Sequence, residues 1–186
     1  MPASFKHTVP TTGMGQPNFS TCWWASYRMI YQYLKRPPSS IDDRLNGIKI
    51  DVDDCKENGL ADTDYGKAAS VLGLKGWSGL TFSKEPSLLD FGLSDGAEAF
   101  LTELDLGPLW VSRIAESRPG KSRGYHVVVA VGYNDDSGKI IYNNPWTQTG
   151  STSAIEMEMR ANLFVRNITA AAASVQGYRY VTGGAE

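Results

Sequence analysis

The feature that most limits the possible folds is the apolar run Val127-Val128-Val129-Ala130-Val131. Successive side chains of a strand point to opposite faces of its sheet, so a strand with one wet face alternates apolar and polar residues. Here both faces are apolar, and we expect a central strand covered on both sides. Strand-like segments precede and follow it at residues 109–114 and 139–143, and residues 134–138 have the composition of a hairpin turn. The second half of the chain therefore predicts a sheet.

The first half of the chain has helical periodicity instead. Trp23, Tyr27, Ile30 and Leu34 recur at three- and four-residue intervals, which predicts one buried face of a helix over about residues 20–35. Ser20 and Thr21 are good N-cap types. Further helices are expected at residues 62–72, 94–106 and 161–175, and further strands at 77–82, 155–159 and 178–181. Residues 36–62 are acidic and are expected to form an irregular surface loop.

Bulk composition limits the kind of protein. At 186 residues the chain fits a single domain, 1–186, in which residues 1–15 read as an extended leader. A net charge of -2 with no basic stripe argues against nucleic acid as a partner. No apolar stretch reaches the 18 or so residues of a membrane span, and the N-terminus lacks the apolar core of a signal peptide. We therefore expect a protein that stays where it is made or is exported without a cleavable signal.

The soft metal ligands of the chain are Cys22, Cys55, His7 and His126. They show no paired spacing, so we expect no metal site and no cofactor. Two cysteines are also too few for a disulfide scaffold.

Cys22 lies where the first predicted helix begins. Unpaired backbone N–H groups and the positive end of the helix dipole favour a thiolate at such a position. The alternative is a small buried apolar cysteine. A cysteine nucleophile needs a base within hydrogen-bond range, and only two histidines exist. His7 lies in the leader, which leaves His126, at the start of the apolar strand, as the candidate base.

Two blocks of the sequence carry a family resemblance. Gln16 is followed six residues later by Cys22-Trp23-Trp24-Ala25-Ser26, and Gly124-Tyr125-His126 precedes Asn143-Asn144-Pro145-Trp146. This order resembles papain-like cysteine peptidases over most of residues 14–146. It is most similar to the compact bacterial branch, namely bacteriocin-processing peptidase domains and effector proteases of plant pathogens. The resemblance implies an α+β papain-like fold, in which a helical side carries the nucleophile helix and packs on an antiparallel β-sheet.

The resemblance also implies roles for individual residues. Asn144 would orient His126, where the compact families have Asp-Pro, and Asn143 is the runner-up. Gln16 would form the oxyanion hole with the backbone N–H of Cys22. Trp146 would shield the histidine–asparagine hydrogen bond or would simply belong to the core. Ordinary turn chemistry for both asparagines and an exposed loop position for Gln16 remain open alternatives.

The leading function is a cysteine protease with a protein or peptide substrate, in the setting of a bacterial effector or toxin. Two other functions remain open. One keeps the thiol chemistry on another substrate, as an amidase of peptidoglycan peptides or a deamidase or transglutaminase-like acyl transferase. The other is a catalytically inactive peptide-binding module. An inhibitory immunity protein or a chaperone is a further partner that the sequence leaves open.

Overall fold

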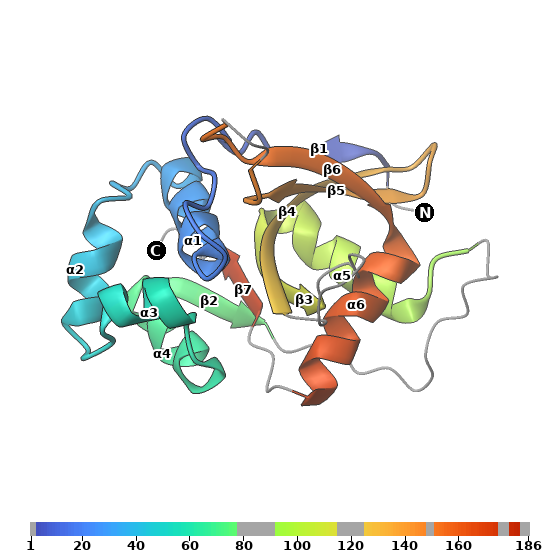
Figure 1. Cartoon of the computed structure of the whole chain (residues 1–186). Coiled ribbons are helices and arrows are strands. Elements are labelled where there is room, and N and C mark those ends of the chain that lie inside the picture. Colours follow the sequence, from blue (N-terminus) through green and yellow to red (C-terminus); the bar gives the residue numbers. More distant parts are fainter. Residues whose placement is uncertain (1–2, 78–91, 115–124, 148–150, 175–178, 183–186) are drawn as a thin grey trace.

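The structure is a computed structural model of the chain and describes residues 3–77, 92–114, 125–147, 151–174 and 179–182. Within these ranges the strands form one sheet in the order β2-β7-β3-β4-β5-β6, with β1 paired to β4 (Figure 1). Every pairing is antiparallel. The predicted α+β architecture, with an antiparallel sheet beside a helical side, is confirmed.

The elements have the following bounds. The strands are β1 Phe5–Lys6, β2 Leu74–Trp77, β3 Leu109–Ile114, β4 Tyr125–Asn134, β5 Lys139–Asn144, β6 Ile155–Arg160 and β7 Arg179–Thr182. The helices are α1 Cys22–Tyr33, α2 Ser40–Asn46, α3 Val52–Asn58, α4 Tyr65–Val71, α5 Asp95–Leu106 and α6 Ala161–Ser174, with a 3-10 turn η1 at Asp62–Asp64.

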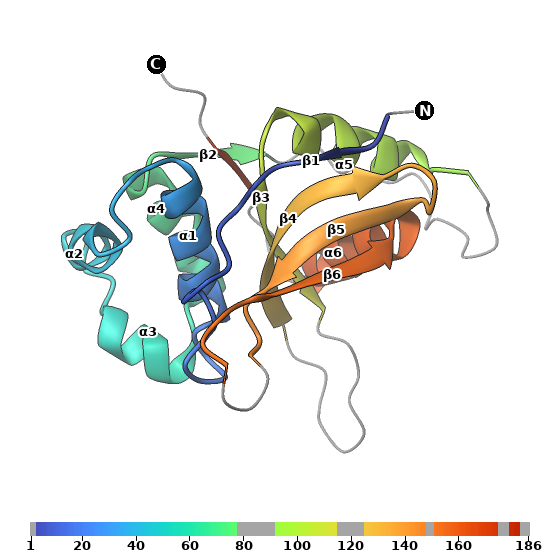
Figure 2. The ribbon, with the colours of Figure 1, turned by 90° about the horizontal axis from the view of Figure 1, so that it is seen from above.

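Strand β4 lies between β3 and β5 and is covered on both faces, as its sequence predicts. Val127, Val129 and Val131 belong to a core formed with α1 and the helices that follow it. Val128 and Ala130 belong to a second core formed with α5 and α6. Figure 2 shows this division, with α1 to α4 on one side of the sheet and α5 and α6 on the other.

Helix α1 begins at Cys22, with Thr21 as its N-cap residue. The expected side-chain cap is not made, because the Thr21 hydroxyl donates to the carbonyl of Asn18 at 3.0 Å instead. The first turn also contains no acidic residue. The backbone N–H groups at the start of α1 are therefore left without a capping side chain.

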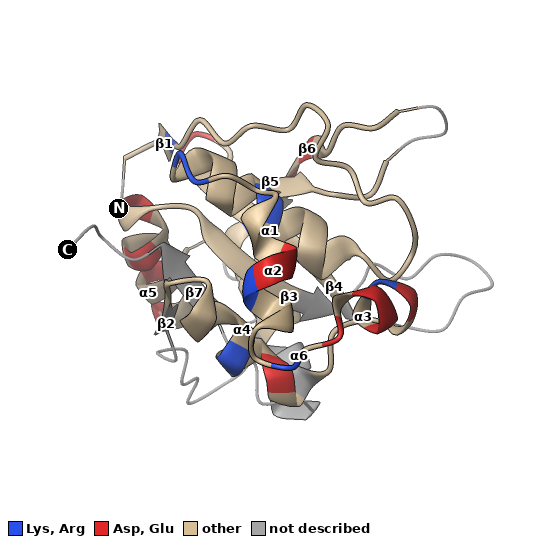
Figure 3. Ribbon diagram, turned by 90° about the vertical axis from the view of Figure 1, so that its left-hand side faces the viewer, with Lys and Arg blue, Asp and Glu red and all other residues tan. Residues whose placement is uncertain are grey.

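The prediction of an irregular loop over residues 36–62 was wrong. This stretch contains α2 and α3, which bury Ile41 with Leu45 and Val52 with Cys55. Each helix has seven residues, so its apolar face has only two members, too few to register as a periodic pattern among many acids. Most of the acidic residues of these helices are exposed, and Figure 3 shows how much of α3 they make up.

The other expected elements differ little from the structure. Ser94 caps α5 by accepting from the Ala97 N–H at 3.2 Å, and Gly73 ends α4 with a left-handed φ of 64°. The strand expected at residues 77–82 overlaps β2 at Trp77, and residues 78–82 lie outside the described residues. None of the described helices has the length and apolarity to cross a bilayer.

The N-terminal segment is fastened to the body and does not hang loose. Strand β1 pairs with the end of β4, and the His7 N–H donates to the Val131 carbonyl at 2.7 Å. The His7 ring hydrogen-bonds to the Leu104 carbonyl at 2.7 Å and lies between the rings of Phe5 and Tyr33. His7 therefore connects the N-terminal segment to α5.

Gly132→Ala should detach this segment. A Cβ at Gly132 would lie 2.8 Å from Lys6 Cα and closer still to the Phe5 carbonyl, so the β1 backbone would have to move. We expect a loss of about 1–3 kcal/mol in the free energy of unfolding, measured by urea denaturation. Lys6→Ala is the control, because it removes only an exposed ion pair with Glu156 and should cost less than about 1 kcal/mol. Equal stabilities for the two variants would contradict the pairing.

Candidate active site

The loop before Cys22 is tied to the end of β5. The Gln16 N–H donates to the Pro145 carbonyl at 2.8 Å, and the Gly15 N–H donates to the Thr152 carbonyl at 2.8 Å. A side chain at Gly15 would collide with this strand-end loop, so only glycine allows the close approach. The segment that leads into the nucleophile helix therefore rests directly on the segment that follows Asn144.

Within this loop, Asn18 accepts or donates most of the hydrogen bonds. Its carbonyl accepts from the Thr21 hydroxyl at 3.0 Å and from the Gln16 side-chain amide at 2.8 Å, and its side-chain oxygen accepts from the Ser20 N–H at 2.9 Å. Sequence reasoning did not identify Asn18. Its only signal was that asparagine commonly closes such local turns.

The Gln16 side chain is buried, with 6% of its surface exposed, so the exposed-loop alternative for this residue was wrong. Because the Asn18 carbonyl can only accept, the nitrogen of the Gln16 amide must face it, and one of its two hydrogens is used there. The amide oxygen has no hydrogen-bond partner among the described residues. One N–H of this amide is thus left for another acceptor.

Cys22 is nearly buried, at 8% exposed, and its thiol forms a hydrogen bond with the backbone of Val127, the residue after His126. Ser26, one turn along α1, donates to the Val127 carbonyl at 3.3 Å. The start of α1 is thus held against the beginning of β4.

Burial raises the pKa of the Cys22 thiol, and backbone hydrogen bonds from Val127, Trp23 and Cys22 itself lower it by less. The expected influence of the helix start is present, because backbone groups lower the pKa of Cys22, but burial outweighs it. The reason is desolvation, which penalises an isolated charge more than the local dipoles favour it. A thiolate at this position requires a neighbouring group that accepts the proton and keeps the pair neutral.

His126 and Asn144 are in direct contact, with 2.7 Å between the ring Nε2 and the side-chain Oδ1. The Trp146 N–H also donates to this oxygen at 3.0 Å, which fixes the orientation of the amide. Since the oxygen carries no proton, the hydrogen must be on Nε2. In the neutral ring, Nδ1 is then unprotonated and can accept a proton.

Asn143, the other candidate, points the opposite way. Adjacent residues of a strand face opposite sides of the sheet. Asn143 is 1% exposed and its amide donates to the Val9 carbonyl at 3.5 Å, within the core of α1. The contact with His126 is made by Asn144 alone of the two.

Two aromatic side chains, those of Trp146 and Phe19, lie beside the His126–Asn144 pair. The Trp146 ring is half-buried and lies edge-on to the His126 ring, with 6.5 Å between centroids. Phe19 packs edge-on against Trp146 at 4.8 Å and is itself 66% exposed. Sequence reasoning did not single out Phe19, and an isolated phenylalanine in a polar loop gives no signal that it has an aromatic neighbour.

The two tryptophans after Cys22 are structural. The Trp23 indole is buried and donates to the Cys55 carbonyl at 3.2 Å. The Trp24 indole donates to Asp42 at 2.7 Å and lies between the cationic groups of Arg28 and Lys56. The Trp23 indole therefore connects α1 to α3, and the Trp24 indole connects α1 to α2 and α3.

Cys55 is free, as is Cys22, and no disulfide joins them. Burial, and then the carboxylates of Asp54, Asp64 and Asp51, raise the pKa of the Cys55 thiol. Cys55 therefore combines a buried thiol with an acidic environment, which are the opposite of the conditions that activate a cysteine. Among the described residues, no group of three histidine, cysteine or acidic side chains could hold a metal ion.

The arrangement of these elements defines a class. A cysteine at the start of a long helix, packed against a sheet that carries a histidine and an asparagine, is the architecture of papain-like cysteine peptidases. The model of the family described as papain-like cysteine protease AvrRpt2 matches residues 4–161. The chain therefore belongs to this family. A comparison with curated proteins gave no match.

Stability at alkaline pH should depend on Cys55. Its folded pKa is raised, so the unfolded thiol ionises first, and the unfolded state is favoured as the pH rises above about 8.5. We expect the free energy of unfolding to be steady from pH 6 to 8 and to fall above that. In Cys55→Ala the fall should be shallower by up to about 1.4 kcal/mol per pH unit. Urea denaturation at pH 7, 8, 9 and 9.5 measures both slopes, and parallel slopes would contradict the assignment.

Proposed function

We propose that this protein is a cysteine protease that hydrolyses peptide bonds with Cys22 as nucleophile, His126 as general base and acid, Asn144 as the orienting group and Gln16 in the oxyanion hole. The observation that carries the proposal is the His126–Asn144 hydrogen bond at 2.7 Å, formed beside the residue whose backbone contacts the Cys22 thiol. Family membership supports the reaction class. The roles of the four residues are our assignment.

The first step is proton transfer from Cys22 to His126. Asn144 keeps the ring proton on Nε2, so Nδ1 is the nitrogen that accepts the thiol proton. Burial disfavours a lone thiolate, yet a thiolate–imidazolium pair is neutral overall and escapes most of that penalty. The dry environment thus makes activation of Cys22 dependent on His126.

The thiolate attacks the carbonyl carbon, and the carbonyl oxygen becomes an oxyanion. Two donors are suited to hold it. One is the second side-chain N–H of Gln16, whose first N–H is fixed on Asn18. The other is the backbone N–H of Cys22, in a first turn that no side chain caps. The fixed loop would supply these donors without reorganisation during the reaction.

Collapse of the tetrahedral intermediate breaks the C–N bond. Protonated His126 gives its Nδ1 proton to the leaving amine, and an acyl-thioester remains on Cys22. Water then enters, His126 removes one of its protons, and the acid is released with the thiol regenerated. Each step uses the same imidazole, so its orientation by Asn144 matters throughout the cycle.

An asparagine differs from an aspartate as the orienting group. Its oxygen accepts the Nε2–H and fixes the tautomer, but it carries no charge to stabilise the imidazolium. Asn144→Asp should therefore preserve geometry and change the pH range of activity, whereas Asn144→Ala removes the orientation itself. The aromatic pair Phe19 and Trp146 lies on the His126 side, where the leaving segment of a substrate would pass.

We further propose that the substrate is a protein of another cell, as for a bacterial effector or toxin. The support is the resemblance of the Gln16–Ser26 and Gly124–Trp146 segments to effector proteases, described above. The test compares the wild-type protein with Cys22→Ala in a cell that the wild-type protein harms, with cleaved proteins identified by mass spectrometry. Equal harm from both proteins would contradict it.

The thiol–imidazole pair predicts selective alkylation. At pH 6, iodoacetamide should modify Cys22 at least tenfold faster than Cys55, because an ordinary thiol is almost fully protonated there. His126→Ala should abolish the difference, and His7→Ala, which changes the other histidine, should preserve it. Peptide mapping by mass spectrometry measures both rates. Slow and equal modification of the two cysteines in the wild-type protein would favour the inactive peptide-binding module.

The same protein should create new N-termini in a denatured proteome, and Cys22→Ala should create none above background. Purified peptidoglycan is the parallel substrate. Release of new amines from peptidoglycan alone would overturn the protease assignment in favour of an amidase.

Gln16→Ala should reduce kcat/KM on a cleaved peptide by 10²–10³, the usual cost of one oxyanion donor, about 3 kcal/mol. Gln32→Ala is the matched control, because Gln32 is an exposed glutamine on α1. The rate of Cys22 alkylation should change less than kcat/KM, since alkylation forms no oxyanion. A loss no greater than that of Gln32→Ala would remove Gln16 from the proposed machinery.

A further inference from the structure

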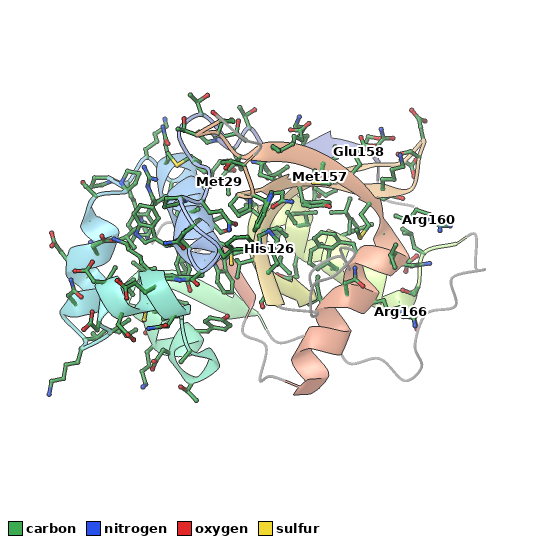
Figure 4. The ribbon with its side chains drawn as sticks, viewed as in Figure 1. Met29, His126, Met157, Glu158, Arg160 and Arg166 are labelled. Atoms are coloured by element: carbon green, nitrogen blue, oxygen red, sulfur yellow. The ribbon has the colours of Figure 1, made fainter. Side chains whose placement is uncertain are left out.

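The amide of Asn144 is held at both ends. Its oxygen accepts from the His126 ring at 2.7 Å and from the Trp146 N–H at 3.0 Å. Its nitrogen, Nδ2, donates to the sulfur of Met157 at 3.3 Å. Figure 4 labels His126 at the start of β4 and Met157 on the neighbouring region of the sheet, on β6. Asn144 thus contacts the His126 imidazole at one end of its amide and the Met157 sulfur at the other.

The strand register explains how Met157 reaches this position. Asn144 pairs with Ile155 and Tyr142 pairs with Met157, so Met157 is the diagonal neighbour of Asn144 on the same face of the sheet. It is half-buried against the core of α5 and α6. The sulfur therefore contacts Nδ2 from within a packed surface and cannot easily be replaced there by water.

A thioether can accept a hydrogen bond and has no proton to donate. If the Asn144 amide turned by 180°, its oxygen would face the sulfur and its NH₂ group would face the Trp146 N–H and the His126 ring. The contacts with the sulfur and with the Trp146 N–H would then be unfavourable, and the His126 ring could accept from the NH₂ group only in its Nδ1–H form. Trp146 selects the correct end of the amide for oxygen, and Met157 selects the correct end for nitrogen.

We propose that Met157 is a positioning residue for the His126–Asn144 pair. By accepting the Nδ2–H, it holds the Asn144 oxygen toward His126 and so keeps the ring proton on Nε2. This inference rests on the proposed function, in which Nδ1 must be unprotonated to take the Cys22 proton. Met157 does not touch the substrate or the reacting atoms.

The chain offers a matched control. Met159 lies two residues further along β6, on the same face, is also half-buried and packs against the same core. Its sulfur is 3.8 Å from the side-chain nitrogen of Asn167, which is not among the residues assigned to catalysis. Met157→Leu and Met159→Leu therefore remove the same atom from equivalent surroundings, and leucine keeps the apolar volume.

The first readout is the tautomer of His126. Long-range ¹H–¹⁵N spectra of the ring in the full-length protein should show the Nε2–H form in the wild type and in Met159→Leu. In Met157→Leu they should show a mixture of the Nε2–H and Nδ1–H forms. A single Nε2–H form in Met157→Leu would overturn the proposal, whatever the protein's enzymatic activity.

The second readout is alkylation of Cys22 by iodoacetamide across pH 5 to 8. Met157→Leu should slow the reaction at pH 6 by three- to tenfold, and Met159→Leu should remain within twofold of the wild type. In an Asn144→Asp background, which has no amide N–H, Met157→Leu should change the rate by less than twofold. An undiminished loss in that background would show that Met157 acts only through packing, and would overturn the proposal.

The two hypotheses fail differently. If the wild-type Cys22 reacts no faster than Cys55, the proposed function fails and this inference, which rests on it, fails with it. If the wild-type Cys22 reacts fast and the two leucine variants behave alike, only the role of Met157 is overturned. Melting temperatures of both variants check that any difference is not a difference in folding.

Discussion

The hydrogen bonds to a single atom, the side-chain oxygen of Asn144, determine what the site can do. That oxygen accepts from the His126 ring and from the Trp146 backbone, and both donors favour the same orientation of the amide. The ring proton is thereby assigned to Nε2. Asn144 is the last residue of β5 and His126 is the second residue of β4. Their contact therefore also requires the two strands to keep their register.

Burial of the Cys22 thiol is a second constraint on the site. Desolvation raises the pKa of the Cys22 thiol more than the surrounding backbone N–H groups lower it. A permanently charged Cys22 sulfur is therefore disfavoured. In the proposed site, the proton instead moves between the Cys22 thiol and the His126 imidazole. Cys55 illustrates the contrast, because it is equally buried but has carboxylates as neighbours. The pKa of each thiol is thus raised, but the groups around the two thiols differ.

Sequence reasoning could identify the elements that carry a strong period and the residue types that carry chemistry. The apolar run of β4 and the face of α1 are such elements, and Cys22 and His126 stood out because each type is rare in the chain. The short helices α2 and α3 were missed because each buries two residues only. The resemblance ranked Asn144 above Asn143, but the residue pattern alone did not separate them, since the choice depends on which face of the sheet each side chain points to. Met157 and Phe19 act through neighbours distant in the chain, and no local pattern records such contacts.

The two halves of the candidate site come from the two halves of the chain, and a shared core and several hydrogen bonds hold them together. Gln16 and Cys22 belong to the loop and helix of the first half, and His126 and Asn144 belong to the sheet of the second. The Gln16–Pro145 backbone hydrogen bond joins the donor of the oxyanion hole to the residue after Asn144, and the Ser26–Val127 bond joins α1 to the residue after His126. Pro145 follows Asn144 and Val127 follows His126. Each hydrogen bond therefore connects the first half of the chain to the residue after one of these two side chains. The backbone beside the side chains of the proposed site therefore helps to hold its two halves in place.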